Sequence, residues 1–178
     1  MNYDKDQAKE IETIKERTIT IKLSDADCER ISNLVGKHGI TVSQLFENFV
    51  GDLVSGTYSN GSDERYMAEQ WFNRCWFGMF PEETLLKYIL DYGINMEDFL
   101  STYEEVEYYE ANPEEYNEEV KEAKENGEER PWFEEEYHDY IDEFIDNHKD
   151  IDMKKEIKLC REWLTDFKNM KGVSADEL

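Results

Sequence analysis

Carboxylate side chains are the groups in this sequence with the greatest capacity for chemistry, and they interleave with tyrosines in two segments. The segments are Tyr103-Glu104-Glu105-Val106-Glu107-Tyr108-Tyr109-Glu110 and Glu134-Glu135-Glu136-Tyr137-His138-Asp139-Tyr140. A helix rises about 1.5 Å per residue, and duplex DNA carries one negative charge per roughly 1.7 Å of its axis. A helical face with about two carboxylates per turn therefore presents negative charge at a spacing of the order found on DNA.

The negative charge is concentrated in one part of the chain. The net charge is −24, and residues 97–146 alone contain 21 acidic and 3 basic residues, a net charge of −18. Such a field repels nucleic acid and anionic membranes and attracts basic protein surfaces. The residues that we predict to contact a basic partner are Glu104, Glu105, Glu107, Glu110, Glu114, Glu115, Glu134, Glu135 and Asp139. The alternative is that the acid only keeps a structural adaptor in solution.

Enzyme motifs are absent from the sequence. It has no GxxxxGK[ST] phosphate loop, no GxGxxG, no GxSxG and no HExxH. The alternating Asp146, His148, Asp150 and Asp152 resemble the start of a calcium loop, but Ile151 stands where the loop needs glycine. Carboxylates are so numerous that no pair of them indicates a hydrolase. We therefore predict a binding protein that is not an enzyme and has no metal site and no cofactor.

The cysteines and the N-terminus indicate the compartment. Cys28, Cys75 and Cys160 are far apart and form no CxxC pair, which is typical of a reduced cytosolic protein. The segment from Met1 to Arg17 is charged throughout and lacks the apolar region of a signal peptide. No apolar run has the length of a membrane span. The sequence therefore predicts a cytoplasmic protein without a membrane partner.

Hydrophobic periodicity predicts a mainly α fold in several parts. We expect a flexible arm over 1–16, a small module over 17–56, a Gly/Ser/Asn-rich linker over 57–61, an acidic helical bundle over 62–171 and a tail over 172–178. Within the module, strict alternation in Thr18-Ile19-Thr20-Ile21-Lys22-Leu23 predicts one short, half-buried strand. Ser24 is the predicted N-cap of a first helix, and Thr41 or Ser43 that of a second. Because a lone strand is unstable, it needs a partner strand.

The order strand, helix, glycine-containing turn and helix within residues 17–56 resembles the ribbon-helix-helix fold of the Arc/MetJ type. In that family two chains pair their strands in a homodimer, and the ribbon enters the major groove of DNA. The resemblance implies that Thr18, Thr20 and Lys22 read bases, and that the helix start at Thr41 and Ser43 holds a phosphate. It implies a DNA-binding transcription regulator of a mobile element. Asp25, Asp27 and Glu29 depart from the basic character that DNA binding needs. The alternative is that the module is a dimerisation or docking platform.

A second resemblance covers residues 17–80. It rests on Thr41-Val42-Ser43-Gln44-Leu45, Gly51-Asp52-Leu53-Val54-Ser55-Gly56-Thr57-Tyr58, Asn60-Gly61-Ser62-Asp63-Glu64-Arg65 and Cys75-Trp76-Phe77-Gly78-Met79-Phe80-Pro81. The run is similar to proteins of mobile elements in gut Firmicutes, a group that includes a type II-A anti-CRISPR. The resemblance implies an inhibitor that acts in the bacterial host cytoplasm on a CRISPR nuclease with its guide RNA. Such nucleases hold DNA in positively charged channels, which an acidic DNA mimic can occupy.

Overall fold

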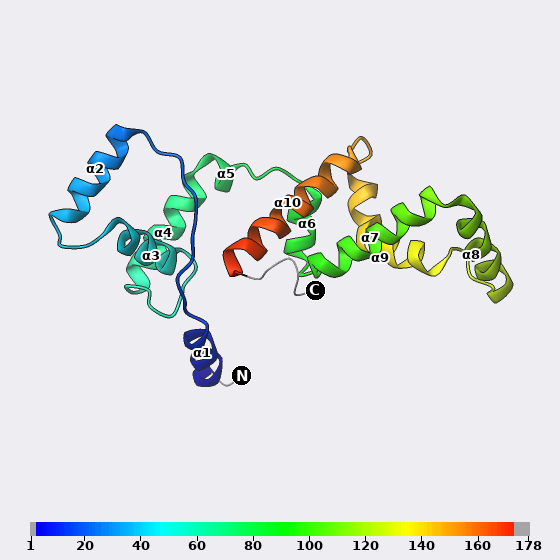
Figure 1. Ribbon diagram of the computed structural model, residues 1–178, viewed down its shortest axis with the longest axis horizontal. Helices are drawn as coiled ribbons and strands as arrows, with labels where there is room; N and C mark the ends of the chain where they lie inside the picture. Colours follow the sequence, from blue (N-terminus) through cyan, green and yellow to red (C-terminus); the bar gives the residue numbers. More distant parts are fainter. Residues whose placement is uncertain (1–2, 173–178) are drawn as a thin grey trace. The chain divides into compact units, whose positions relative to one another are not determined.

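The structure is a computed structural model that describes residues 3–172 (Figure 1). All regular structure in this range is helical. The chain divides into two compact units, which we call the N-terminal unit (Met1–Pro81) and the C-terminal unit (Glu82–Leu178). The predicted tail lies outside the described residues except for Gly172, which caps the last helix in a left-handed conformation.

The N-terminal unit consists of five helices in its described part. They are α1 (Tyr3–Glu12), α2 (Asp25–Gly36), α3 (Val42–Leu53), α4 (Ser62–Arg74) and α5 (Trp76–Met79). The hydroxyl of Ser24 accepts a hydrogen bond from Asp27 N and caps α2, as predicted. Thr41 caps α3 in a capping box with Gln44, in which each side chain accepts from the other residue's backbone N–H.

The predicted strand and the ribbon-helix-helix fold are wrong. Residues 14–24 form no regular structure, and no strand occurs anywhere in residues 3–172. The alternation of Ile19, Ile21 and Leu23 is real, but this part of the chain offers no neighbouring strand to complete a hydrogen-bonded ladder. All three side chains are exposed, and Ile19 is 63% exposed. The mainly α class is correct, whereas the paired ribbon is not.

The N-terminal unit buries few residues. Among its described residues only Val35, Asp52 and Ala68 are buried. Asp52 accepts hydrogen bonds from the backbone N–H of Asn60 at 2.7 Å and from its side-chain amide at 2.9 Å. These bonds fasten the predicted linker 57–61 to α3, so that segment lies within the N-terminal unit.

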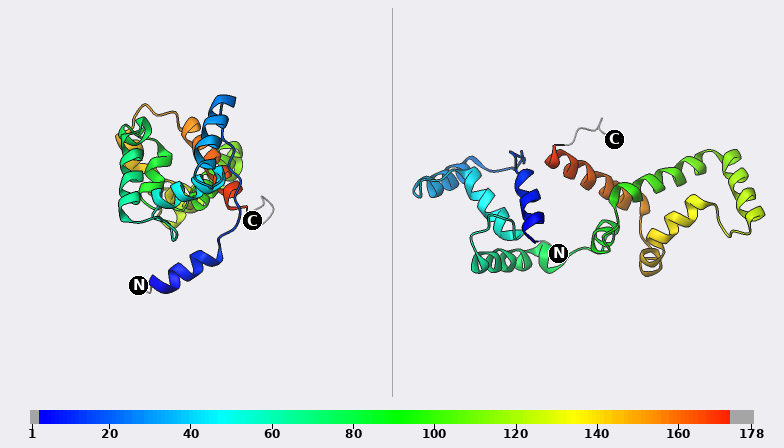
Figure 2. Two further views of the ribbon diagram at one scale, coloured as in Figure 1. Left: turned by 90° about the vertical axis from the view of Figure 1, so that its left-hand side faces the viewer. Right: turned by 90° about the horizontal axis from the view of Figure 1, so that it is seen from below.

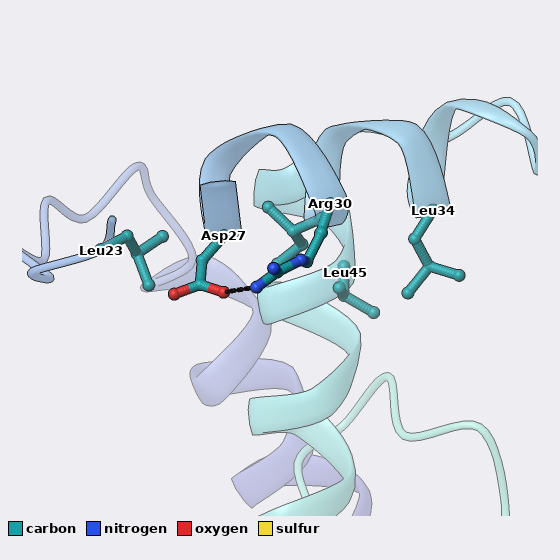
Figure 3. Close-up of a pocket in the computed structure, with 6 residues that line it drawn as sticks. Leu23, Asp27, Arg30, Leu34 and Leu45 are labelled. Carbon is teal, nitrogen blue, oxygen red and sulfur yellow. Dashed lines mark hydrogen bonds and ion pairs between the residues drawn. The ribbon is translucent and has the colours of Figure 1, made fainter. Parts of the chain in front are cut away.

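An open apolar hollow lies between α2 and α3 in this unit (Figure 3). It has a volume of about 320 Å³, and Leu23, Ile31, Leu34 and Leu45 supply most of its lining. Asp27 and Arg30 form a 2.9 Å ion pair along it. Because both charged side chains are more than half exposed, the pair contributes little to stability.

The C-terminal unit also consists of five helices in its described part. They are α6 (Leu85–Asp91), α7 (Met96–Ala111), α8 (Pro113–Asn126), α9 (Trp132–Asn147) and α10 (Met153–Lys171). Three of these helices begin at a local cap: Thr84, Asn95 and Asp152 cap α6, α7 and α10 with side-chain oxygens. Pro113 suits the first turn of α8, where a missing N–H has no cost.

The core of the C-terminal unit lies between α7 and α9, with α6 and α10 against it. Figures 1 and 2 show α7 and α9 as neighbours, and α10 beside α6. The fully buried residues of this core are Leu85, Ile89, Phe99, Ile141, Phe144, Ile157 and Cys160. At the α8 end, Phe133 is also fully buried and stacks on Tyr109 with ring centroids 4.1 Å apart. Aromatic side chains thus supply much of the area that holds the helices together.

A buried carboxylate connects two helices of this core. Glu156 in the first turn of α10 is 6% exposed, and its Oε2 accepts a 2.9 Å hydrogen bond from Leu85 N. Leu85 is the first residue of α6, where backbone N–H groups have no partner within the helix. Glu156 therefore acts as a distant cap for α6, favoured by the positive end of that helix.

The environments of two cysteines predict different reactivity. Cys160 is fully buried, and this burial raises the pKa of its thiol to about 12. Cys28 is exposed on α2. Because the thiolate is the reactive form, we expect Ellman's reagent at pH 8 to modify Cys28 within minutes and to leave Cys160 intact until the protein unfolds. Peptide mass spectrometry after partial labelling checks this, and equal labelling of both thiols in the folded protein would contradict it.

Candidate functional site

One face of α9 carries a continuous row of carboxylates. Its members are Glu135, Glu136, Asp139, Asp142, Glu143 and Asp146, all exposed, and we call this set the carboxylate stripe. At about 100° per residue the six fall within roughly a third of the helix circumference. They span residues 135–146, which gives about one carboxylate per 3 Å of helix axis. This spacing is close to the roughly 3.4 Å between phosphates along one strand of duplex DNA.

The opposite face of α9 fixes the stripe in place. Phe133, Ile141 and Phe144 are buried on that face. Tyr137 packs against Phe99 and Tyr103 of α7 with ring centroids 6.3 and 5.6 Å away. A helix held by such packing presents its outer side chains from a rigid backbone, which limits the entropy lost on binding.

Few cations lie close to the stripe. The segment 132–147 contains no lysine or arginine. His138 Nδ1 lies 2.6 Å from Asp142 Oδ1, and Arg130 approaches the other oxygen of Asp142 at 3.9 Å. No ion pair involves Glu135, Asp139 or Asp146 among the described residues. Their charge is therefore available to a partner.

The acidic residues of α7 have a different environment because α10 supplies cations to them. Arg161 lies 3.0 Å from Glu107 and 3.6 Å from Glu104, and Lys168 lies 2.8 Å from Glu97. The Arg161 guanidinium also lies over the ring of Tyr103, 5.7 Å from its centroid. These pairs connect α7 to α10 and partly neutralise one side of the acidic region.

The structure thus separates the nine predicted partner-binding carboxylates into groups. Glu104 and Glu107 pair with Arg161. Glu115 and Glu134 accept hydrogen bonds from the hydroxyls of Tyr108 and Tyr116.

The other five predicted carboxylates have no ion pair among the described residues, and they lie on three helices. Glu105 and Glu110 are on α7, Glu114 is on α8, and Glu135 and Asp139 belong to the stripe on α9. The structure therefore does not bring all nine onto one face.

The stripe contains four residues that the sequence reasoning did not select. They are Glu136, Asp142, Glu143 and Asp146. The signal was present, since carboxylates recur at helical spacing opposite the apolar positions and no lysine or arginine interrupts them. The interleaved tyrosines and carboxylates cover only residues 134–140 of this helix. The exposed carboxylates recur at helical spacing as far as Asp146.

The surrounding acid also affects the tyrosines. Burial, followed by the charges of neighbouring groups, raises the pKa of Tyr137 well above its usual value. The pKa of Tyr116 is raised chiefly by its hydrogen bond to Glu134. Both phenols are therefore neutral at physiological pH and add no charge to the surface, and the Tyr116 hydroxyl donates its hydrogen bond to Glu134.

The residues predicted to bind DNA lie on the N-terminal unit. Thr18, Thr20 and Lys22 are exposed on a segment without regular structure, so they do not form a ribbon that could enter a groove. Thr41 and Ser43 do lie at the start of α3. There the capping box already engages the backbone N–H groups of Thr41 and Gln44, which leaves fewer donors for a phosphate.

Comparison with known proteins gives no relative. No family model matches the chain, and neither a curated protein nor a solved structure is significantly similar to it. Within residues 3–172 no group of His, Cys, Asp and Glu side chains is arranged to hold a metal ion. No helix in the same range is both long and apolar enough to cross a membrane.

Proposed function

We propose that this chain inhibits a type II RNA-guided CRISPR nuclease by binding a basic surface of the nuclease–guide complex through its C-terminal unit. The carboxylate stripe of α9 is the observation that carries the proposal. It combines rigid support, a charge spacing close to that of one DNA strand, and few neighbouring cations. The choice of target rests on the resemblance of residues 17–80 to proteins of mobile elements.

Electrostatics determines the kind of partner. Residues 82–178 contain 31 acidic and 11 basic residues, a net charge of −20, so this unit repels nucleic acid. A nuclease channel that holds a duplex through its backbone presents the complementary charge. In this proposal the protein binds without catalysis and acts in the cytoplasm of the bacterial host, where the nuclease works.

Charge reversal within the stripe tests the proposal. Replacing Glu135, Asp139 and Asp146 with lysine changes the net charge by +6. These replacements remove no ion pair among the described residues. We expect this triple variant to weaken binding to a guide-loaded type II nuclease by at least about 100-fold in 50 mM NaCl. Inhibition of duplex cleavage is expected to fall in parallel. Biolayer interferometry and a plasmid cleavage assay measure the two effects.

A second triple variant supplies the control. Replacing Glu10, Glu12 and Glu16 with lysine changes the net charge by the same amount. These three residues are exposed on the N-terminal unit. This variant is expected to inhibit nearly as well as the natural sequence. Equal losses in both variants would show that net charge alone matters. Absence of inhibition by the unmodified chain would exclude this target, and salt-independent binding would exclude the electrostatic mechanism.

A further inference from the structure

The α4–α5 corner of the N-terminal unit exposes a concentrated group of large apolar side chains. They are Trp71, Phe72, Trp76, Phe77, Met79 and Phe80, and we call this set the apolar patch. Trp76 is 76% exposed and Phe80 is 57% exposed. Scattered apolar residues are ordinary on a protein surface, but six large exposed ones within residues 71–80 are a concentration typical of an interaction site.

Several aromatic rings of the patch contact one another. Phe77 lies 5.0 Å from Phe72 and 6.3 Å from Trp71 between ring centroids, and Trp76 lies 5.1 Å from Phe80. Trp71 in turn meets Phe49 of α3 edge to face at 5.1 Å. Trp71, Phe72 and Phe77 are therefore connected through Phe49 to the helix pair α3–α4.

Gly78 explains how the corner is formed. A Cβ at this position would lie 2.2 Å from the carbonyl oxygen of Phe72. Only glycine permits α5 to approach the end of α4 so closely. The rings are thus arranged before binding, which reduces the entropic cost of association.

The exposed area of the patch is comparable with one side of a stable dimer interface. With about 200 Å² for each large side chain, the exposed fractions correspond to about 650 Å². The largest patch on an ordinary monomer is about 300–600 Å², and a standard interface buries about 800 Å² per partner. The N-terminal unit also buries only Val35 and Ala68 as apolar residues in its described part, so its own core is small.

We propose that a second copy of this chain covers the apolar patch, with two patches packed against each other about a two-fold axis. Charge favours this occupant: residues 62–81 contain 3 acidic and 2 basic residues, so copies meeting here scarcely repel each other, unlike the C-terminal units with −20 each. Exposed Glu69 and Arg74 lie on opposite sides of the apolar face of α4. A two-fold axis parallel to α4 places Glu69 of one copy near Arg74 of the other.

This inference does not depend on the proposed function, and it replaces the strand as the site of dimerisation. The sequence predicted a homodimer formed by pairing one strand from each chain, but the described residues contain no strand. The patch lies more than 45 residues further along the chain. The basic partner proposed for the C-terminal unit would bind a different surface.

Sedimentation equilibrium of the full chain tests the inference. We expect the natural sequence to sediment with twice its 21.3 kDa monomer mass at about 10 µM, where a dimer with sub-micromolar affinity is complete. The double variant Trp76→Ala/Phe80→Ala is expected to raise the dissociation constant by at least about 100-fold, because buried aromatic anchors dominate such interfaces. Tyr66→Ala is the matched control, since Tyr66 is exposed on the same helix more than 100° away from Trp71.

A gentler variant separates association from folding. Trp76→Glu removes little packing from the monomer, because Trp76 is mostly exposed, but it places like charges across the two-fold axis. Helical circular dichroism close to that of the natural sequence, together with a monomer mass, would support the inference. A monomeric natural chain, or a dimer unaffected by Trp76→Glu, would overturn it.

Discussion

Replacing Phe99 with alanine is expected to lower the free energy of unfolding of the C-terminal unit by about 3–5 kcal/mol. Phe99 is fully buried on α7 and packs against Tyr137 and Tyr140, with ring centroids 6.3 and 6.0 Å away. The loss combines the transfer free energy of the ring with the cost of a cavity between α7 and α9. Urea unfolding followed by circular dichroism at 222 nm, with a two-domain fit, gives the difference.

Tyr108→Ala is the control for this prediction. Tyr108 lies on the same helix and is 50% exposed, although it donates a hydrogen bond to Glu115. Its replacement is expected to cost no more than about 1 kcal/mol. Equal losses at Phe99 and Tyr108 would show that the α7–α9 contact is not the core of the unit.

Replacing Glu156 with alanine is the change with the second largest expected effect on stability. It leaves the N–H of Leu85 without its acceptor in a site where Leu85 is fully buried. An unsatisfied buried donor costs about 1–3 kcal/mol, and we expect a loss of that size in the same urea experiment. Hydrogen exchange at the Leu85 amide is expected to accelerate as well.

Two variants give this prediction its specificity. Glu156→Gln retains an oxygen acceptor and is expected to recover much of the loss. Glu162→Ala removes an exposed carboxylate on the same helix that only approaches Lys158 at 3.6 Å, and is expected to change stability by less than about 0.5 kcal/mol. A loss from Glu162→Ala equal to that from Glu156→Ala would point to helix propensity or net charge instead of the α6 cap.

Local interactions account for the features that were predictable from the sequence. The starts of α2 and α3 follow from cap residues within four positions of the groups they satisfy. The apolar period expected of the helical bundle over 62–171 depends on residues three and four apart in the same helix, as in α9. The concentration of acid between 97 and 146 is likewise a property of the sequence itself.

The strand failed because its stability is not local. Alternation in 18–23 shows how a strand would place its side chains, but a strand exists only when another supplies its hydrogen bonds. None of the described residues does so. The segment therefore has no regular structure, and Ile19, Ile21 and Leu23 are exposed.

The sequence by itself determined the helical character, the helix starts and the sign of the charge, because each depends on residues within a few positions of one another. Only the tertiary structure decided which carboxylates are neutralised and which face outward. Arg161 reaches Glu107 across 54 positions, and Glu156 reaches Leu85 across 71. Helix packing creates these neighbours. The stripe on α9 is exposed because the hydrophobic effect favours burial of the opposite face of that helix, which carries the aromatic and aliphatic side chains.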